Sequence, residues 1–158
     1  MNLNLNLGIV KNYTSKTQIV RILTENWVKE NAYCPRCGEF PLSKFENNKP
    51  VADFHCINCK EQYELKSTKK KFANRITDGA YLSMLDRLKS SENPNFFLLN
   101  YTNSYKVSDL IIIPKHFFTS TMIIPRNPLS TTAKRAGWIG CSIDISQLTP
   151  AGKVFLVN

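Results

Sequence analysis

Two pairs of cysteines are the part of this sequence best suited to bind a metal. Cys34 and Cys37 form one C-x2-C pair, Cys56 and Cys59 form a second, and 18 residues (38–55) lie between the pairs. Zinc in structural sites is held tetrahedrally by four thiolates, and pairs at this spacing supply them. We therefore predict a structural zinc site with these four ligands. Such a site is coordinatively closed and cannot activate water, so any catalysis must use other residues.

Two further residues and two competing explanations bear on this site. His55 adjoins the second pair and is the remaining candidate ligand, but four cysteines leave it no coordination position. Cys141 stands in a strand-like apolar run, where a thiol more often packs as a small buried side chain than acts as a nucleophile. The alternatives to zinc are incidental buried thiols or a redox C-x-x-C pair, and the latter lacks a thioredoxin-like context here.

Two carboxylates and a lysine around the second cysteine pair could bind another metal. Asp53 precedes the pair, and Glu64 and Lys66 follow it. If the pair forms the turn between two antiparallel strands, Asp53 and Glu64 meet on the face that holds Lys66. Phosphodiester hydrolysis needs a hard cation such as Mg²⁺, which prefers carboxylate oxygens. We predict Asp53, Glu64 and the Leu65 carbonyl as its ligands. Lys66 would orient or deprotonate the attacking water and offset charge on the phosphate. Taken alone, the spacing also fits a solvated strand, where Glu-x-Lys is common.

Hydrophobic periodicity predicts the elements that hold these residues. Apolar residues at helical spacing predict one helix over about 14–31 and a second from Ile76 to before Asn93. Segment 34–59 lacks this period and is expected to form loops and short strands around the metal. The predicted strands span 62–66, 96–101, 107–113, 139–145 and 154–157. This order indicates an α/β or α+β sandwich with a mixed sheet.

The composition indicates one compact domain with an anionic partner. The chain has 158 residues, 42% of them hydrophobic, which suffices for one substantial core. Its 21 Lys and Arg against 12 Asp and Glu give a net charge of +9, which favours nucleic acid or a membrane surface. Because no apolar run is long enough to span a bilayer and the start does not resemble a signal peptide, we expect a soluble intracellular protein.

Two basic stretches are candidate phosphate contacts. One, 69–71, directly follows the predicted catalytic strand, and the other runs over 126–135. Arg and Lys bind phosphate whatever the base sequence, although a basic stretch is often only a solvated face. The indole of Trp138, at the end of the second stretch, could meet an apolar methyl group in the major groove or cap the core. The candidate DNA contacts are Lys69, Lys70, Arg126, Lys134, Arg135 and Trp138.

Several segments of the chain resemble one known family. The stretch 50–54 followed by 64–67 looks like the PD-(D/E)xK nuclease signature, except that the proline stands three residues before Asp53 rather than next to it. The chain also resembles DpnI-type restriction endonucleases in the segments 21–25, 33–38, 45–48, 78–81, 93–97 and 135–141. The resemblance implies an α/β, PD-(D/E)xK restriction-endonuclease-like fold, with a mixed sheet flanked by helices and an inserted four-cysteine zinc site.

The same resemblance implies a function. Enzymes of this family are type II, methyl-directed endonucleases that cut double-stranded DNA at adenine-methylated GATC with Mg²⁺ and leave 5′-phosphate and 3′-hydroxyl ends. By resemblance, the catalytic residues are Asp53, Glu64 and Lys66, and a structural Zn²⁺ accompanies the catalytic Mg²⁺. The expected partner is DNA containing N6-methyladenine, and the expected setting is the bacterial cytoplasm, with the protein monomeric in solution.

Two expectations concern domain content and an alternative function. DpnI-type enzymes continue into a winged-helix domain that also reads methylated DNA. We expect residues 1–158 to be a single catalytic domain with zinc knuckles at 34–59 and without that domain, either as a truncated form or as a single-domain relative. The alternative function is a zinc-ribbon module that binds nucleic acid without catalysis. Asp53, Glu64 and Lys66 distinguish the two, because a binding module does not need all three.

Overall fold

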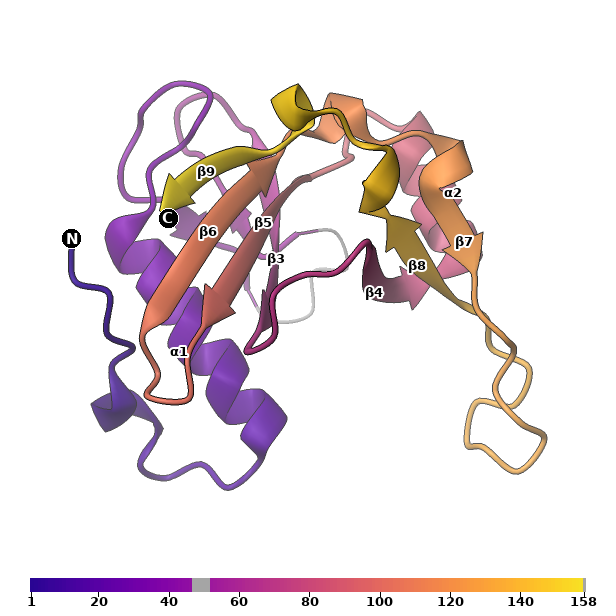
Figure 1. The fold of residues 1–158 in the computed structure, drawn as a ribbon, viewed down its shortest axis with the longest axis horizontal. Coiled ribbons are helices and arrows are strands. Elements are labelled where there is room, and N and C mark those ends of the chain that lie inside the picture. Colours follow the sequence, from indigo (N-terminus) through magenta and orange to yellow (C-terminus); the bar gives the residue numbers. More distant parts are fainter. Residues whose placement is uncertain (47–51, 158) are drawn as a thin grey trace.

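A computed structural model describes residues 1–46 and 52–157 of the chain (Figure 1). Pro50 of the nuclease-like signature and residues 47–48 of another resembling segment lie outside the described residues. The α-helices are α1 (Lys16–Asn31) and α2 (Tyr81–Lys89). The strands are β1 (Ser43–Lys44), β2 (Phe54–His55), β3 (Gln62–Thr68), β4 (Arg75–Ala80), β5 (Asn95–Tyr101), β6 (Val107–Ile113), β7 (Ile123–Pro125), β8 (Gly140–Asp144) and β9 (Val154–Val157). Short 3-10 helices span Leu7–Val10, Lys115–Phe117, Ser120–Met122, Ile145–Gln147 and Pro150–Gly152.

The strands form two sheets. The larger has the order β1-β2-β3-β5-β6-β9, in which β3 and β5 run parallel and the other neighbours antiparallel. The smaller has the order β4-β8-β7 and is antiparallel. A mixed α/β fold with a mixed sheet, as predicted from the sequence, is therefore confirmed.

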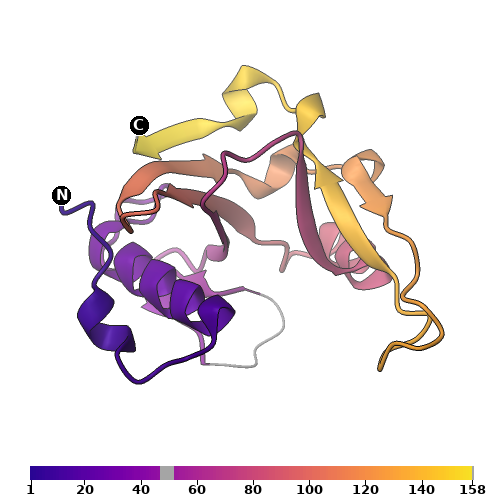
Figure 2. The same ribbon diagram turned by 60° about the horizontal axis from the view of Figure 1, so that its bottom comes forward.

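Strand β5 lies at the centre of the core and is buried along its whole length. Successive side chains of a strand point to opposite faces, so Phe97 and Leu99 pack toward α1 while Phe96 and Leu98 pack toward the smaller sheet. A strand covered on both faces has a continuous apolar sequence. The result is three layers: α1 with the cysteine segment, the larger sheet, and the smaller sheet with α2 (Figures 1 and 2).

Helix α1 covers the larger sheet with an apolar stripe. Leu23, Trp27 and Val28 are buried, at the i, i+4, i+5 spacing that places side chains on one face. The indole Nε1 of Trp27 donates to the carbonyl oxygen of Asn2 at 2.8 Å, which satisfies its one polar atom. The helix predicted over about 14–31 is confirmed, with its start at Lys16.

The second helix is shorter than the sequence pattern predicts. Residues 76–80, expected in its first turns, belong to strand β4 (Arg75–Ala80), and α2 begins at Tyr81. Ile76 and Ala80 have helical spacing, but Ile76 and Thr77 are β-branched and favour extended chain. Pairing of β4 with β8 buries Ile76 between the sheets. This burial stabilises the strand more than one short helical repeat stabilises a helix. Strand β7 is a further difference, because the pattern predicts no strand between Pro114 and Gly137.

The chain between β7 and β8 extends away from both sheets (Figures 1 and 2). We call residues 126–139 the projecting loop. The N–H of Gly137 donates to the Leu129 carbonyl, and the N–H of Leu129 donates to the Trp138 carbonyl, both at 3.0 Å. Gly137 has a φ of 76°, a conformation that glycine adopts most readily. Among the described residues, no helix has both the length and the apolar character needed to cross a membrane.

Candidate functional site

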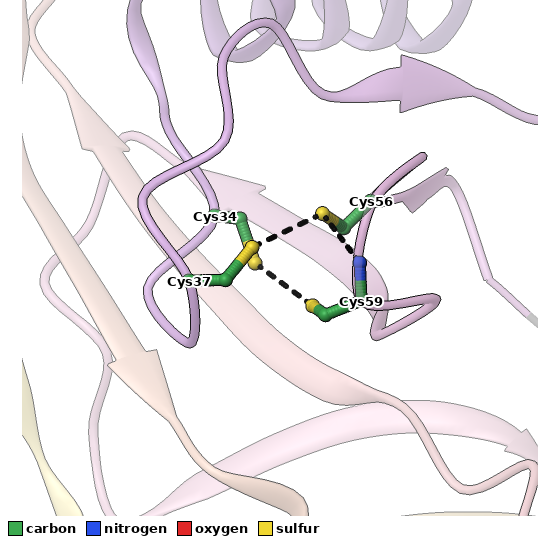
Figure 3. A group of neighbouring side chains, drawn as sticks. All are labelled: Cys34, Cys37, Cys56 and Cys59. Carbon is green, nitrogen blue, oxygen red and sulfur yellow. Dashed lines mark hydrogen bonds between the residues drawn. The ribbon is translucent and has the colours of Figure 1, made fainter.

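The four cysteines of the two C-x2-C pairs converge in space (Figure 3). Their Sγ atoms all lie within 4.8 Å of one another. Cys34 and Cys59, and likewise Cys37 and Cys56, bring their sulfurs to 3.5 Å. Zinc bound to four thiolates at about 2.3 Å separates the sulfurs by about 3.8 Å. The donor set and its spacing fit a tetrahedral zinc ion, so the cluster indicates a structural zinc site.

Each cysteine pair sits in a tight turn that ends on a residue with positive φ. In the first turn the N–H of Gly38 donates to the Cys34 carbonyl at 2.8 Å, and Gly38 has a φ of 80°. In the second the N–H of Lys60 donates to the Cys56 carbonyl at 3.1 Å, and Lys60 has a φ of 63°. Glycine therefore stands where the chain turns back in the first knuckle. A lysine in this conformation costs roughly 1 kcal/mol, and its Nζ donates to the Ile57 carbonyl at 2.6 Å.

Two of these thiols differ in pKa, and a bound cation would stabilise their thiolate forms. Burial raises the pKa of the Cys59 thiol to about 12, whereas a backbone hydrogen bond at Glu39 lowers the pKa of the Cys37 thiol to about 7. The Tyr63 hydroxyl lies 3.0 Å from the sulfur of Cys34, and burial raises the pKa of this hydroxyl, so it stays protonated and able to donate. Zinc requires thiolates, and a central cation offsets the cost of burying them.

His55 and Cys141 lie outside the cluster. The ring of His55 stacks on Phe45 with centroids 4.4 Å apart. Cys141 is fully buried on β8, and burial raises the pKa of its thiol to about 11. The interpretation of Cys141 as a small buried side chain is confirmed.

Glu61 ties the second cysteine turn to the larger sheet. Its carbonyl accepts the N–H of Cys56 at 2.8 Å. Its carboxylate accepts from Arg36 at 2.8 Å, Asn95 at 2.7 Å and Lys115 at 3.0 Å. Strands β2 and β3 pair antiparallel on either side of this turn. The second knuckle is therefore the turn between two antiparallel strands, which meets the condition set in the sequence analysis, and it fixes the residues that flank them.

Asp53 takes the place of a further strand residue beside β3. Its N–H donates to the Tyr63 carbonyl at 3.0 Å, and its Oδ2 accepts the backbone N–H of Leu65 at 2.7 Å. In an extended strand the N–H and the carbonyl of one residue point to the same side, so the Leu65 carbonyl is directed toward Asp53. The Asp53 carboxylate thus lies against the residue between Glu64 and Lys66.

Glu64 and Lys66 share the face of β3 that is turned toward the smaller sheet. The Nζ of Lys66 lies 2.6 Å from Oε1 of Glu64 and 2.8 Å from Oδ1 of Asp78 on β4. The Nη2 of Arg87 on α2 lies 3.1 Å from Oε2 of Glu64. Burial raises the pKa of Glu64, and the Lys66 charge partly offsets this. Burial alone would lower the pKa of Lys66, but the two carboxylates raise it, so the amine is an ammonium.

A groove of about 880 Å³ runs between α1 and the end of β3. Asp53 lines it, so the groove reaches the edge of β3 where that carboxylate lies. Its cations are Lys16 and Arg21 from α1 and Lys69 and Lys70 from the chain after β3. We call this the α1 groove. Two of the six predicted DNA contacts therefore gather here with two cations of α1.

The other four predicted DNA contacts lie on the projecting loop, on the side of the smaller sheet (Figure 1). Arg126 is exposed, and its N–H donates to the Gly140 carbonyl at 2.9 Å. Lys134 is exposed as well. The guanidinium carbon of Arg135 lies 4.5 Å from the centre of the Trp138 ring, which is half-buried. The six residues thus form two separate groups on either side of the β3 edge.

Sequence reasoning does not single out Asp78, Arg87 or the cations of α1. Asp78 is missed because residues 76–80 are predicted as helix, although the β-branched pair before Asp78 and the glycine after it are signals of an irregular strand. Arg87, Lys16 and Arg21 occupy polar positions of amphipathic helices. No local spacing shows which of these positions meet β3.

Comparison with known families bears on this geometry. A family model described as "DpnI: Dam-replacing family" matches residues 1–158. The match includes both the cysteine cluster and the edge of β3. This family implies a DNA substrate and suggests restriction endonuclease activity, and it is consistent with a methyl-directed enzyme. Because the match spans the whole chain, the protein belongs to the DpnI, or Dam-replacing, family.

Proposed function

We propose that this chain is a type II, methyl-directed restriction endonuclease that hydrolyses double-stranded DNA at adenine-methylated GATC. The observation that carries the proposal is the position of Asp53, whose carboxylate binds the backbone between Glu64 and Lys66. Asp53 thereby lies beside the strand segment whose Glu64 carboxylate, Leu65 carbonyl and Lys66 ammonium would complete the site. Membership in the DpnI family supports the same reaction.

The donors at this edge suit a magnesium ion. Mg²⁺ prefers carboxylate and carbonyl oxygens and keeps several of its waters. We assign Asp53, Glu64 and the carbonyl of Leu65 as its protein ligands, where it would polarise a phosphoryl oxygen and promote ionisation of water. The zinc cluster is closed, so its role is to hold β2 and β3 in register.

Lys66 serves as the positioned cation of the site. An ammonium has three donors, and the contacts to Glu64 and Asp78 use two of them. The remaining donor can hold the attacking water or a phosphate oxygen. Lys66 is half-buried, so its charge is screened less than that of a surface lysine and offsets the charge of the phosphate.

DNA contacts are divided between the two groups of cations. The phosphate backbone is bound by the four cations of the α1 groove, Lys16, Arg21, Lys69 and Lys70. Contacts of this kind position the protein on DNA and carry no base information. The projecting loop reads the site, with Trp138 against the N6-methyl group in the major groove. A methyl group adds apolar surface there, and an indole held by Arg135 offers an apolar face to it.

We further infer that residues 1–158 form one catalytic domain. The core that packs against α1 and the core that packs against the smaller sheet both include residues of β5. Removing either layer would therefore expose a buried face of that strand. A nucleic-acid-binding module without catalysis would need the zinc cluster and the α1 groove, but it would not need Glu64, Lys66 and Asp78 to meet in the interior.

The test is cleavage of plasmid DNA by the purified chain with Mg²⁺. Plasmid from a host that methylates adenine in GATC should be cut at those sites, and plasmid from a host that lacks this methylation should be cut less or not at all. The Lys66→Ala variant is the control for a contaminating nuclease. Binding of both plasmids without cleavage, under conditions where the zinc-loaded chain is folded, would instead identify a binding module.

A further inference from the structure

Asp78 connects the edge of β3 to the smaller sheet. Its Oδ1 receives the Lys66 ammonium at 2.8 Å and the N–H of Gly79 at 2.7 Å. The Asp78 side chain is only 6% exposed, and within the described residues its Oδ2 is buried without a hydrogen-bond partner. Asp78 stands on β4, whereas Lys66 stands on β3 of the larger sheet. The contact therefore spans two layers of the molecule.

A β-bulge sets the direction of the Asp78 side chain. In the pairing of β4 with β8, Asp78 is opposite Cys141 and Ala80 is opposite Gly140, so Gly79 is the extra residue. A bulge bends its strand and re-aims the neighbouring side chain. The hydrogen bond from Gly79 to Asp78 holds the carboxylate in this orientation. Any movement of the bulge would move the anion that holds Lys66.

The indole of Trp138 packs on the strand opposite this bulge. A methyl group added to Gly140 would lie 2.8 Å and 2.9 Å from Cζ3 and Cη2 of Trp138, and 3.6 Å from the Gly79 carbonyl oxygen. The absence of a side chain at Gly140 therefore lets the indole approach β8 directly. The guanidinium carbon of Arg135 lies 4.5 Å from the centre of the same ring. A ligand that presses on the ring would press on the bulge as well.

We propose that Asp78 is a positioning residue that holds the Lys66 ammonium and couples its place, through the Gly79 bulge, to the seating of Trp138 on DNA. This inference rests on the proposed function. Glu64 and Asp78 share Lys66, so Asp78 keeps the ammonium in place when a Glu64 oxygen turns to another cation. When the projecting loop binds a methylated site, the bulge and Asp78 align Lys66 with the scissile phosphate. Asp78 itself touches neither the DNA nor the metal.

The first arm of the test measures single-turnover cleavage of a methylated duplex by zinc-loaded Asp78→Asn. The matched control is Asp86→Asn, which removes the same charge from an exposed position on α2. We expect the rate at saturating DNA to fall by about 10- to 100-fold in Asp78→Asn, as misplacement of a reacting group by about 1 Å does, and to stay unchanged in Asp86→Asn. The Kd for DNA and the Mg²⁺ concentration at half-maximal rate should not change. A higher Mg²⁺ requirement would make Asp78 a metal ligand and overturn the positioning role.

The second arm tests the coupling by displacing the Trp138 indole. Gly140→Ala keeps the indole but forces it off β8. If Trp138 acts through the bulge, Gly140→Ala and Asp78→Asn should together slow cleavage by much less than the product of their separate effects, since coupled residues are not additive. Multiplicative effects would contradict the coupling. If Asp78→Asn fails to fold, Gly140→Ala alone tests the coupling, because it displaces the indole and leaves Asp78 unchanged.

A third arm does not depend on activity. In protein labelled with 5-fluorotryptophan, the ¹⁹F signal of Trp138, assigned by Trp138→Phe, should shift in Asp78→Asn and stay in place in Asp86→Asn. An unmoved signal in Asp78→Asn would refute the link between the two residues. If the unmutated chain cuts no DNA, the proposed function fails, and this arm still decides whether Asp78 and Trp138 are coupled.

Discussion

The backbone N–H of Leu65 donates to Oδ2 of Asp53 at 2.7 Å, so one carboxylate side chain completes the hydrogen bonding of β3 where strand β2 does not extend. The same contact places a negative charge beside the residue that separates Glu64 from Lys66. Asp53 thus has a structural role through an oxygen that accepts and a chemical role through its charge. Substitutions can separate these roles, because an amide keeps the acceptor and loses the charge.

Asp53→Asn should retain the fold and lose cleavage. The amide oxygen can still accept from Leu65, so we expect little change in the free energy of unfolding, whereas Asp53→Ala should lose about 0.5–1.5 kcal/mol with the hydrogen bond. Both variants should slow cleavage by roughly 100-fold or more, because each removes an electrostatic contribution to the transition state. Urea unfolding and single-turnover cleavage measure the two effects. Full activity of Asp53→Asn would show that the charge is not needed for chemistry.

The zinc cluster should respond differently to loss of a ligand and to loss of the Tyr63 hydroxyl. Cys56→Ser should lower zinc content and destabilise the fold, because the binding energy of a structural metal is also folding energy. Tyr63→Phe should keep stoichiometric zinc but lower its affinity by about 10-fold, since it removes a donor 3.0 Å from the Cys34 sulfur. Elemental analysis and competition with a chromogenic chelator report these quantities. A folded Cys56→Ser protein with unchanged stability would argue against a structural metal.

Thiol reactivity should separate the five cysteines into the four of the zinc cluster and the buried Cys141. In the zinc-loaded protein at pH 8, a disulfide reagent should modify less than one thiol per chain, because four are metal ligands and Cys141 is buried with its pKa raised to about 11. A chelator should release the four ligands, and urea should release the fifth. Rapid labelling of the native protein that disappears in Cys141→Ala would show that this thiol is accessible.

The sequence predicts the parts of this site that depend on local spacing. Two C-x2-C pairs with a glycine after the first predict the zinc cluster, because the ligands of each pair need only one turn to converge. Alternation along β3 predicts that Glu64 and Lys66 share a face, and their contact at 2.6 Å confirms it. Asp53 lies beside β3 because the second knuckle is itself the turn that returns the chain.

The parts that depend on packing between layers are not predictable in the same way. Ile76 and Ala80 are apolar side chains at helical spacing, and only the pairing of β4 with β8 makes residues 76–80 part of a strand. Asp78 and its contact with Lys66 follow from that pairing. The approach of Arg87 to Glu64 depends on how α2 packs, and the joining of α1 cations to Lys69 and Lys70 depends on how α1 lies on the sheet. A single sequence contains no local signal for either arrangement.

The α1 groove should contribute binding that depends on salt and not on base sequence. Lys16→Ala and Lys69→Ala should each weaken binding to methylated and unmethylated duplexes equally, and each should reduce the slope of log K against log salt concentration by about 1. Lys29→Ala is the matched control, because Lys29 is exposed on the same helix but does not line the groove. Titrations at several salt concentrations with Ca²⁺ in place of Mg²⁺ give the slopes. An equal loss of affinity in Lys29→Ala would show that the net positive charge, and not the position of the lysines in the groove, determines binding.

Methyl selectivity should reside in the projecting loop and depend on the Trp138 indole. Burying one methyl group contributes about 0.8 kcal/mol, which is roughly 4-fold in affinity, and a fully methylated site offers two such groups. Duplexes with no, one and two methyl groups should therefore be cut at rising rates by the unmutated chain at subsaturating DNA. Trp138→Ala should flatten this series, whereas Lys134→Ala, on the same loop, should lower all three rates and keep their ratios. Equal rates on the three duplexes with the unmutated chain would place methyl reading outside these residues, and an unchanged series in Trp138→Ala would assign it to another side chain of the loop.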